Sequence, residues 1–165
     1  MSTIRTKRLL LRPYSIEDRD DYISLVTDPL VMAHIDGDVA SEEVAEDWWQ
    51  RLIGASSKDL RWSVRALVDG HYVGHGMINY SRPGNACELG YILARAEWGS
   101  GFATEIAGAM ADYSRDIMKL KEIFATVDED HPASRRVLEK VGMEFYGYDF
   151  DDVGRYLVYV LNHEG

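Results

Sequence analysis

The segment that organises this sequence reads Trp98-Gly-Ser-Gly-Phe-Ala-Thr-Glu105. An apolar, strand-like run, Cys87-Glu-Leu-Gly-Tyr-Ile-Leu93, precedes it, and apolar residues recur at helical spacing from Ile106 to Ile117. The order is therefore strand, short loop, glycine-rich turn and helix. Such a turn presents backbone N–H groups at the positive end of a helix dipole, which favours anions. The segment therefore predicts a site for a phosphate-bearing ligand.

The length and composition predict one domain, spanning residues 1–165, because the apolar fraction of 46% and the charged fraction of 28% are ordinary for a globular protein. A net charge of −10 argues against sequence-independent binding of nucleic acid and mildly favours cationic partners. The apolar stretches are too short to cross a membrane, and residues 1–12 lack the apolar core of a signal peptide. Cys87 lies within an apolar run, so we expect a buried thiol and a reducing, cytoplasmic location.

The remaining patterns alternate between strand and helix periods. The predicted elements are, in order, a strand over residues 8–12, helices over 16–27 and from 42 onward, strands over 62–68, 71–80 and 86–93, the helix after the glycine turn, a strand over 123–127, a helix over 132–141, and strands over 145–150 and 155–161. Ser15 and Ser41 are the expected N-caps of the first two helices. This order predicts an α/β (α+β mixed) fold with a mixed sheet, in which only residues 86–127 form a parallel crossover.

Helical spacing places Val44, Trp48 and Leu52 on one face of the second helix. Alternation in the strand that follows it places Val68 on the same side as its apolar neighbours. Trp49 and Trp62 are expected in the core or in the wall of a groove.

The histidines do not predict a metal site. His71 and His75 would lie about 13 Å apart on a strand, which is too far to share one ion. His34 and His163 are expected to be isolated surface residues.

The glycine turn also resembles a broken dinucleotide fingerprint, with Thr104 in place of the third glycine. Glu122 lies near the expected position of a ribose-binding acid. Against this alternative, residues 94–98 separate the strand from the turn, and the chain begins with antiparallel elements rather than a nucleotide-binding βαβ unit.

The second half of the chain contains Asp130-His-Pro-Ala-Ser-Arg-Arg-Val-Leu-Glu-Lys-Val-Gly142. Together with Trp98–Glu105 and Glu88-Leu-Gly-Tyr91, this stretch resembles the GNAT acetyltransferase superfamily, and most closely its RimJ/RimL-like branch of ribosomal-protein N-terminal acetyltransferases. Residues 6–13 and 27–31 are similar to that branch as well. The resemblance implies a central, mostly antiparallel mixed sheet splayed between its fourth and fifth strands, residues 86–93 and 122–127. Helices would cover both faces, and acetyl-CoA would lie in the gap.

The resemblance also implies a set of residues that bind acetyl-CoA. The family's pyrophosphate loop, Arg/Gln-x-x-Gly-x-Gly/Ala, falls on residues 98–103, where Trp98 replaces the arginine or glutamine, so phosphate contacts would come mainly from backbone N–H groups. His131 stands where the branch usually has asparagine. The implied cofactor-binding residues are Leu93 and Ala94 for the pantetheine arm, Trp98, Gly99, Ser100, Gly101, Phe102, Ala103 and Thr104 for the phosphates, and His131 and Ser134.

Acetyl transfer to an amine needs a neutral amine and a proton for the departing thiolate. Glu88 is the candidate base, since it shares a strand face with Gly90, whose missing side chain would leave room for a substrate. Ser134 matches a serine that lies near the cofactor sulfur in the branch, whereas Leu138 stands where many GNAT enzymes place a tyrosine acid. The structural alternatives are a strand carboxylate at Glu88 and a helix-surface hydroxyl at Ser134. His131 could act as an additional base.

The sequence thus predicts an acetyl-CoA-dependent N-acetyltransferase that transfers the acetyl group directly to a primary amine, without a metal. The acceptor would be a protein N-terminus or a small amine, to which Asp36 and Asp38 could contribute attraction. A homodimer is plausible by resemblance. The alternatives are a GNAT-fold acyl-CoA sensor without catalysis and a small dinucleotide-binding protein.

Overall fold

A single eight-stranded sheet organises the chain, with strand order β1-β2-β3-β4-β5-β6-β8-β7. The computed structural model describes residues 2–35, 39–54, 58–80, 87–152 and 154–163. The strands are β1 (Ile4–Arg5), β2 (Leu9–Pro13), β3 (Leu60–Ala66), β4 (Tyr72–Asn79), β5 (Glu88–Leu93), β6 (Glu122–Asp128), β7 (Glu144–Phe150) and β8 (Arg155–Asn162). Every neighbouring pair is antiparallel except β5 and β6, which run parallel. The mixed, mostly antiparallel sheet is therefore confirmed.

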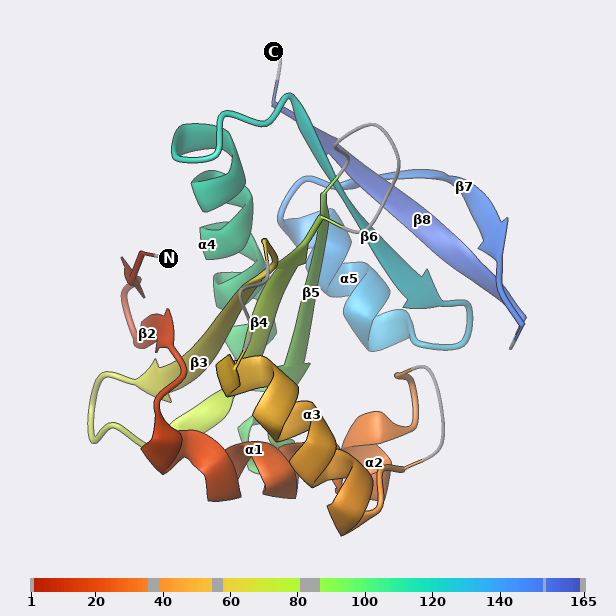
Figure 1. Cartoon of the computed structure of the whole chain (residues 1–165). Helices are drawn as coiled ribbons and strands as arrows, with labels where there is room; N and C mark the ends of the chain where they lie inside the picture. The colour runs from red at the N-terminus through yellow and green to blue at the C-terminus, as the bar shows by residue number, and fades with distance from the viewer. Residues whose placement is uncertain (1, 36–38, 55–57, 81–86, 153, 164–165) are drawn as a thin grey trace.

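Helices cover both faces of this sheet (Figure 1). They are α1 (Arg19–Val26), α2 (Pro29–Met32), α3 (Glu42–Gly54), α4 (Phe102–Asp116) and α5 (Pro132–Lys140). Buried residues of α1, α2 and α3 form one apolar cluster against Tyr72 and Ile92 of the sheet. Residues of α4 and α5 belong to the main core on the other face. In the part of the chain that is described, no helix has the length and apolar character to cross a membrane.

The sheet opens between β5 and β6. Among the described residues, one pair, Glu88 and Phe124, joins these two strands, close to the start of each. The Phe124 N–H donates to the carbonyl of Cys87 at 3.1 Å, and beyond that point the strands diverge (Figure 1). The predicted splay is confirmed at this place, although Ala86, the first residue of the predicted strand, lies outside the described residues.

Ser15 and Ser41 precede helical segments as predicted, but the helix predicted over residues 16–27 is divided in two. Ser15 begins a 3-10 turn over Ile16–Asp18, and α1 follows directly. Pro29 then starts the short helix α2. Ser41 caps α3 as predicted, since its Oγ accepts from the Val44 N–H at 3.3 Å.

Because α3 is a continuous helix, Val44, Trp48 and Leu52 share one face as predicted, but the fully buried side chains lie one position further along. Ala45 and Trp49 are fully buried, whereas Val44 is 43% exposed. The rotation follows from aromatic packing, because the Trp49 ring lies 5.8 Å from that of Tyr22 and 6.0 Å from that of Tyr14. These partners come from outside the helix, so its own spacing could not reveal them.

Val68 was predicted on the wrong side. It is 87% exposed, because β3 ends at Ala66 and the chain has already entered the connection to β4. Gly70 closes this connection in a left-handed conformation, with φ of +79°, and donates its N–H to the Ala66 carbonyl. Trp49 and Trp62 are fully buried, and Cys87 is buried without a disulfide, as predicted.

A buried carboxylate ties the first strand-helix connection to the sheet. Asp18 is fully buried and accepts hydrogen bonds from the Arg12 guanidinium at 2.7 and 2.8 Å, from the Ser15 N–H at 2.8 Å and from Arg65. Burial alone raises the pKa of Asp18, but the hydrogen bonds from Arg12, Ser15 and Arg65 outweigh it and lower the pKa to about 2. The ionised carboxylate is therefore the form that the fold stabilises.

This pKa predicts acid sensitivity. Because the folded-state pKa lies below the unfolded value of about 3.9, Asp18 stabilises the fold above pH of about 4, and this is lost as the pH falls towards 2. We expect the free energy of unfolding, measured in urea, to lose about 2 kcal/mol from this group between pH of about 5 and 2. Asp18→Asn should remove that part of the acid dependence and cost about 3 kcal/mol at neutral pH.

Asp20→Asn is the matched control, since Asp20 lies two residues after Asp18, in the first turn of α1, and its side chain is 91% exposed. An Asp18→Asn protein with the acid dependence of the wild type would contradict the assignment.

Candidate active site

A cavity of about 330 Å³ lies in the opening between β5 and β6. Its lining includes Glu88, Gly90 and Tyr91 from β5, Thr126 and Asp128 from β6, His131, Ser134 and Leu138 from the start and body of α5, and Met77 and Asn79 from β4. Three residues that the sequence singled out, Glu88, His131 and Ser134, therefore meet in one cavity. We call this cavity the cleft.

The cleft is reached from both faces of the sheet. Side chains alternate along a strand, so Glu88, Gly90 and Ile92 share one face and Tyr91 lies on the other. Ile92 packs with the α1–α3 cluster, and Tyr91 reaches Ser134 on α5. Glu88 therefore approaches the cleft from the side of α1–α3, and Ser134 approaches it from the opposite side.

Glu88 is half-buried and is held by a neighbouring strand. The Thr126 hydroxyl donates to its Oε1 at 2.6 Å. Asn79 is its partner in the register of β4 and β5, and the Asn79 Oδ1 is a buried acceptor to which no described residue hydrogen-bonds. The space above Gly90 is occupied, since a Cβ added there would lie 2.5 Å from Cε of Met77. The expected room at Gly90 is thus filled by a flexible side chain.

Ser134 has a partner that the sequence did not reveal. Its Oγ lies 2.9 Å from the Tyr91 hydroxyl. Burial raises the pKa of Tyr91 to about 12, against a lowering by the bond to Ser134, so the phenol stays protonated. Leu138 is buried in the wall of the cleft and offers no acid group.

His131 stacks on His34, with ring centroids 4.1 Å apart. Burial lowers the pKa of His131, and the neighbouring His34 lowers it further. His34 Nδ1 lies 3.7 Å from Asp128 and 3.8 Å from Asp130. The prediction that His34 is isolated was therefore wrong, because α2 and the start of α5 meet only in the folded chain.

The three possible metal ligands His34, Asp128 and Asp130 lie within 4.8 Å of one another. Asp130 is 86% exposed, so the group has the open, hydrated setting of a surface ion pair. His163 was also predicted to be isolated, but its Nε2 lies 2.8 Å from the buried Ser114 hydroxyl.

The glycine turn has the predicted geometry for an anion site. Gly99 and Gly101 adopt left-handed conformations, with φ of +75° and +79°, and Gly101 is the residue immediately before α4. Trp98 is half exposed and donates its Nε1–H to the Leu93 carbonyl at 3.2 Å. The Ala94 N–H donates to the Val73 carbonyl at 2.9 Å. Both of these backbone groups, expected to serve the pantetheine arm, are thus engaged within the chain.

Arg8 brings a positive charge to this turn from the other end of the sequence. Its guanidinium donates to the Ser100 carbonyl at 2.9 Å, pairs with Glu105 at 2.7 Å and lies 4.4 Å from the centre of the Phe102 ring. The Glu105 pKa is raised by burial but lowered more by hydrogen bonds from Thr6 and Arg8. The sequence predicted mainly backbone contacts and did not reveal Arg8, since nothing in it places this residue beside a loop 92 residues away.

A sheet opened between two parallel neighbours, with a glycine turn and helix after the first of them, defines a GNAT-type acyltransferase. The comparisons agree. The family model for the acetyltransferase (GNAT) domain matches residues 8–144. The uncharacterized protein YkkB of Bacillus subtilis (strain 168) is 33% identical over 147 residues, which cover 85% of this chain and 84% of the relative.

Two solved structures show the same fold. An acetyltransferase of the GNAT family from Bacillus anthracis has a TM-score of 0.88 and 26% identity, covering 99% of this chain and 100% of that chain. Mycobacterium smegmatis RimJ in complex with CoA-disulfide has a TM-score of 0.81 and 20% identity, covering 99% of this chain and 87% of that chain. The chain belongs to the GNAT acetyltransferase family. The predicted family is confirmed.

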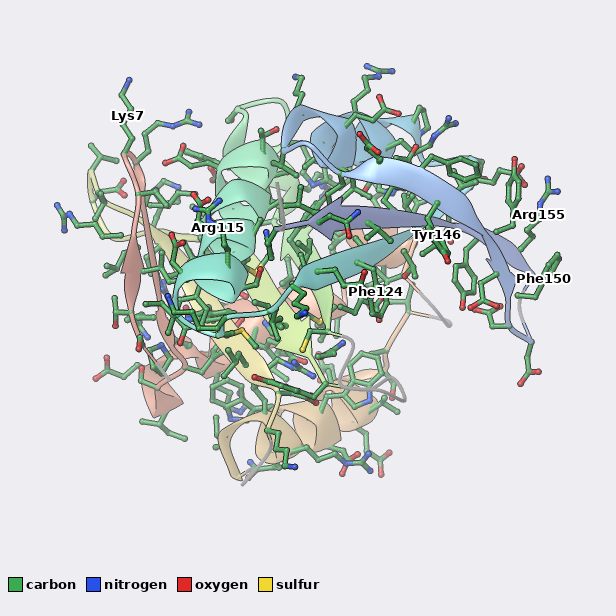
Figure 2. All side chains as sticks on the ribbon, turned by 90° about the horizontal axis from the view of Figure 1, so that it is seen from above. Lys7, Arg115, Phe124, Tyr146, Phe150 and Arg155 are labelled. Carbon is green, nitrogen blue, oxygen red and sulfur yellow. The ribbon has the colours of Figure 1, made fainter. Side chains whose placement is uncertain are left out.

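The position of Arg8 predicts an effect on the binding of coenzyme A. We expect Arg8→Gln to raise the dissociation constant of acetyl-CoA about fivefold in calorimetry at low salt, because a cation beside the phosphate loop is lost. Lys7→Gln is the matched control, since Lys7 extends into solvent at the outer edge of the sheet (Figure 2). Equal affinities of the two variants at low salt would contradict a role for Arg8.

Proposed function

We propose that this protein is an acetyl-CoA-dependent N-acetyltransferase that transfers the acetyl group directly to a primary amine. The observation that carries the proposal is the pair of groups that reach one cleft from opposite faces of the sheet, the Glu88 carboxylate and the Ser134 hydroxyl. Direct transfer requires an amine and a thioester to meet from two sides, and this arrangement provides for both. We take residues 1–165 as one catalytic domain.

Glu88 is the proposed base. Amines are mostly protonated near neutral pH, so the carboxylate removes the proton that blocks attack. The amine nitrogen then forms a bond to the thioester carbon, and the carbon–sulfur bond breaks. The bond from Thr126 fixes one carboxylate oxygen of Glu88 and leaves the other for the amine.

Ser134 is the proposed partner of the departing sulfur. Its hydroxyl donates a hydrogen bond to the thiolate, and Tyr91, which stays protonated, donates to Ser134 in turn. The proton taken up by Glu88 returns to the thiolate through solvent, and the second proton, which the nitrogen loses as the amide forms, is released to solvent. His131, whose lowered pKa keeps the imidazole neutral, is placed to hydrogen-bond the cofactor in the same cleft.

The turn over residues 98–104 is the proposed pyrophosphate site. Backbone N–H groups at the start of α4 supply the donors, and Arg8 adds a charge. Leu93 and Ala94 remain the proposed neighbours of the pantetheine arm. No metal is required by this chemistry.

The cellular setting is also a proposal. A cytoplasmic location is supported by the single cysteine, Cys87, which forms no disulfide. A homodimer stays a prediction, and Asp36 and Asp38, the proposed attractors of a cationic acceptor, lie outside the described residues.

The role of Glu88 is tested by release of free thiol from acetyl-CoA in the presence of a panel of primary amines. We expect Glu88→Gln to lower kcat/KM by about 100-fold or more at neutral pH, with a smaller loss at high pH, where the amine is already neutral. The affinity for acetyl-CoA should stay within about twofold of the wild type.

Glu122→Gln is the matched control, because Glu122 is an exposed carboxylate at the start of β6. Unchanged turnover of Glu88→Gln at every pH would remove Glu88 from this role. Binding of acetyl-CoA without thiol release from any amine would instead favour an acyl-CoA sensor.

A further inference from the structure

A second cavity, of about 690 Å³, lies beside the cleft on the side of α1–α3. Ile35 and Met77 line both spaces, so these two side chains form the partition between them. The volume is in the range of pockets that hold small molecules. On this face of β4 the side chains of His75, Met77 and Asn79 follow one another and lead from the second cavity to Glu88. We call the second cavity the side pocket.

The side pocket is lined mainly by apolar and aromatic side chains. Tyr14, Tyr22, Trp48, Leu52 and Met32 are among them. Tyr14 and Tyr22 stand edge to face, with ring centroids 5.7 Å apart and planes inclined by 82°. Such walls favour a flat, apolar group, which can lie against ring faces and edges.

The charges around the side pocket are unfavourable for a second ammonium group. The charged residues in its described lining are Arg51, Arg61 and Asp59, and Asp59 pairs with Arg61 at 3.3 Å. Burial lowers the pKa of His75 to about 3, with a further lowering by Arg61, so this imidazole is neutral. Arg51 is likewise paired, with Asp47 at 2.7 Å, so each arginine and the aspartate of the described lining already has an oppositely charged partner. A polycation would therefore meet apolar walls and ion pairs that leave no carboxylate of this lining for a second ammonium.

Two polar groups along the route point to a small polar ligand. The Asn79 Oδ1 is buried beside Glu88, and no described residue hydrogen-bonds to it. The His75 Nδ1 is bonded to the Tyr14 hydroxyl at 2.9 Å, and within the described residues its Nε2 makes no hydrogen bond. Asn79 can accept from an amine N–H next to the proposed base, and His75 can bond one neutral polar substituent on the body of the acceptor.

We propose that the acceptor is a primary amine with a single ammonium group and a flat, uncharged body. The flat body of the acceptor occupies the side pocket. The part of the acceptor that joins this body to the nitrogen passes Met77, whose side chain moves away from Gly90. The nitrogen lies between Glu88 and the Asn79 Oδ1. This inference rests on the proposed N-acetyltransferase function and names its substrate class.

The test compares n-hexylamine with 1,6-diaminohexane in the thiol-release assay at saturating acetyl-CoA. The two amines have the same chain length and differ in one terminal ammonium. We expect kcat/KM to be about tenfold or more higher for hexylamine, because the second ammonium would be desolvated without an opposite charge. Phenethylamine, whose ring fits the aromatic walls, should exceed hexylamine.

Variants of α3 locate the site. We expect Trp48→Ala to raise the KM for phenethylamine about tenfold while kcat stays within about twofold, because the ring loses one wall of the pocket. Val44→Ala, on an exposed position of the same helix outside the pocket lining, should change neither constant. Arg51→Glu alters an exposed side chain at the rim, and it should raise the ratio of kcat/KM for diaminohexane over hexylamine about fivefold.

The outcomes separate this inference from the proposed function. Thiol release that is equal or faster with the diamine, or ratios that neither Trp48→Ala nor Arg51→Glu changes, would overturn the substrate class and leave the N-acetyltransferase function standing. If no amine releases thiol, the proposed function fails. In that case calorimetry with phenethylamine decides: binding that Trp48→Ala abolishes supports the side pocket, and no binding to the wild type overturns it.

Discussion

The pairing of Glu88 with Phe124 is the constraint on which the site depends. Two parallel strands that start side by side and then diverge leave a gap that no other strand fills. The gap exists because antiparallel partners hold each strand on its outer side, β4 against β5 and β8 against β6. The sheet is thus stable on both sides of an opening that runs through it.

The opening allows side chains from the two faces of the sheet to reach one space. Residues that alternate along β5 send Glu88 towards α1–α3 and Tyr91 towards α5, so the groups proposed to act on an amine and on a sulfur stand on opposite sides. An intermediate on the protein is unnecessary, because both substrates can occupy the gap at once. The side pocket lies on the Glu88 side, which is where an acceptor must arrive.

Features encoded in short stretches were predictable from the sequence. The left-handed glycines before α4, the N-cap at Ser41 and the course of the strands around the splay all follow from local rules. The core face of α3 and the partners of Ser134, Glu105 and His131 were not predictable. Each depends on a side chain from a distant element, and a single sequence does not state which distant elements touch.

The resemblance to the family implies that the glycine turn is a pyrophosphate loop, and the structure shows which residues surround that turn. Arg8, the residue immediately before β2, reaches the glycine turn with its side chain. Met77 fills the space that the missing side chain of Gly90 leaves. Both contacts depend on the folded chain. The first adds a charge to a loop expected to rely mainly on backbone groups, and the second places a flexible side chain between the proposed base and its proposed acceptor.

The central claim is that the amine and acetyl-CoA occupy the opening together and react directly. Initial rates at several fixed concentrations of each substrate, with n-hexylamine as the acceptor, test it most directly. Lines that intersect in double-reciprocal plots, the pattern of a ternary complex, are the predicted result. Parallel lines, the pattern of an acetylated enzyme that forms before the amine binds, would contradict the account.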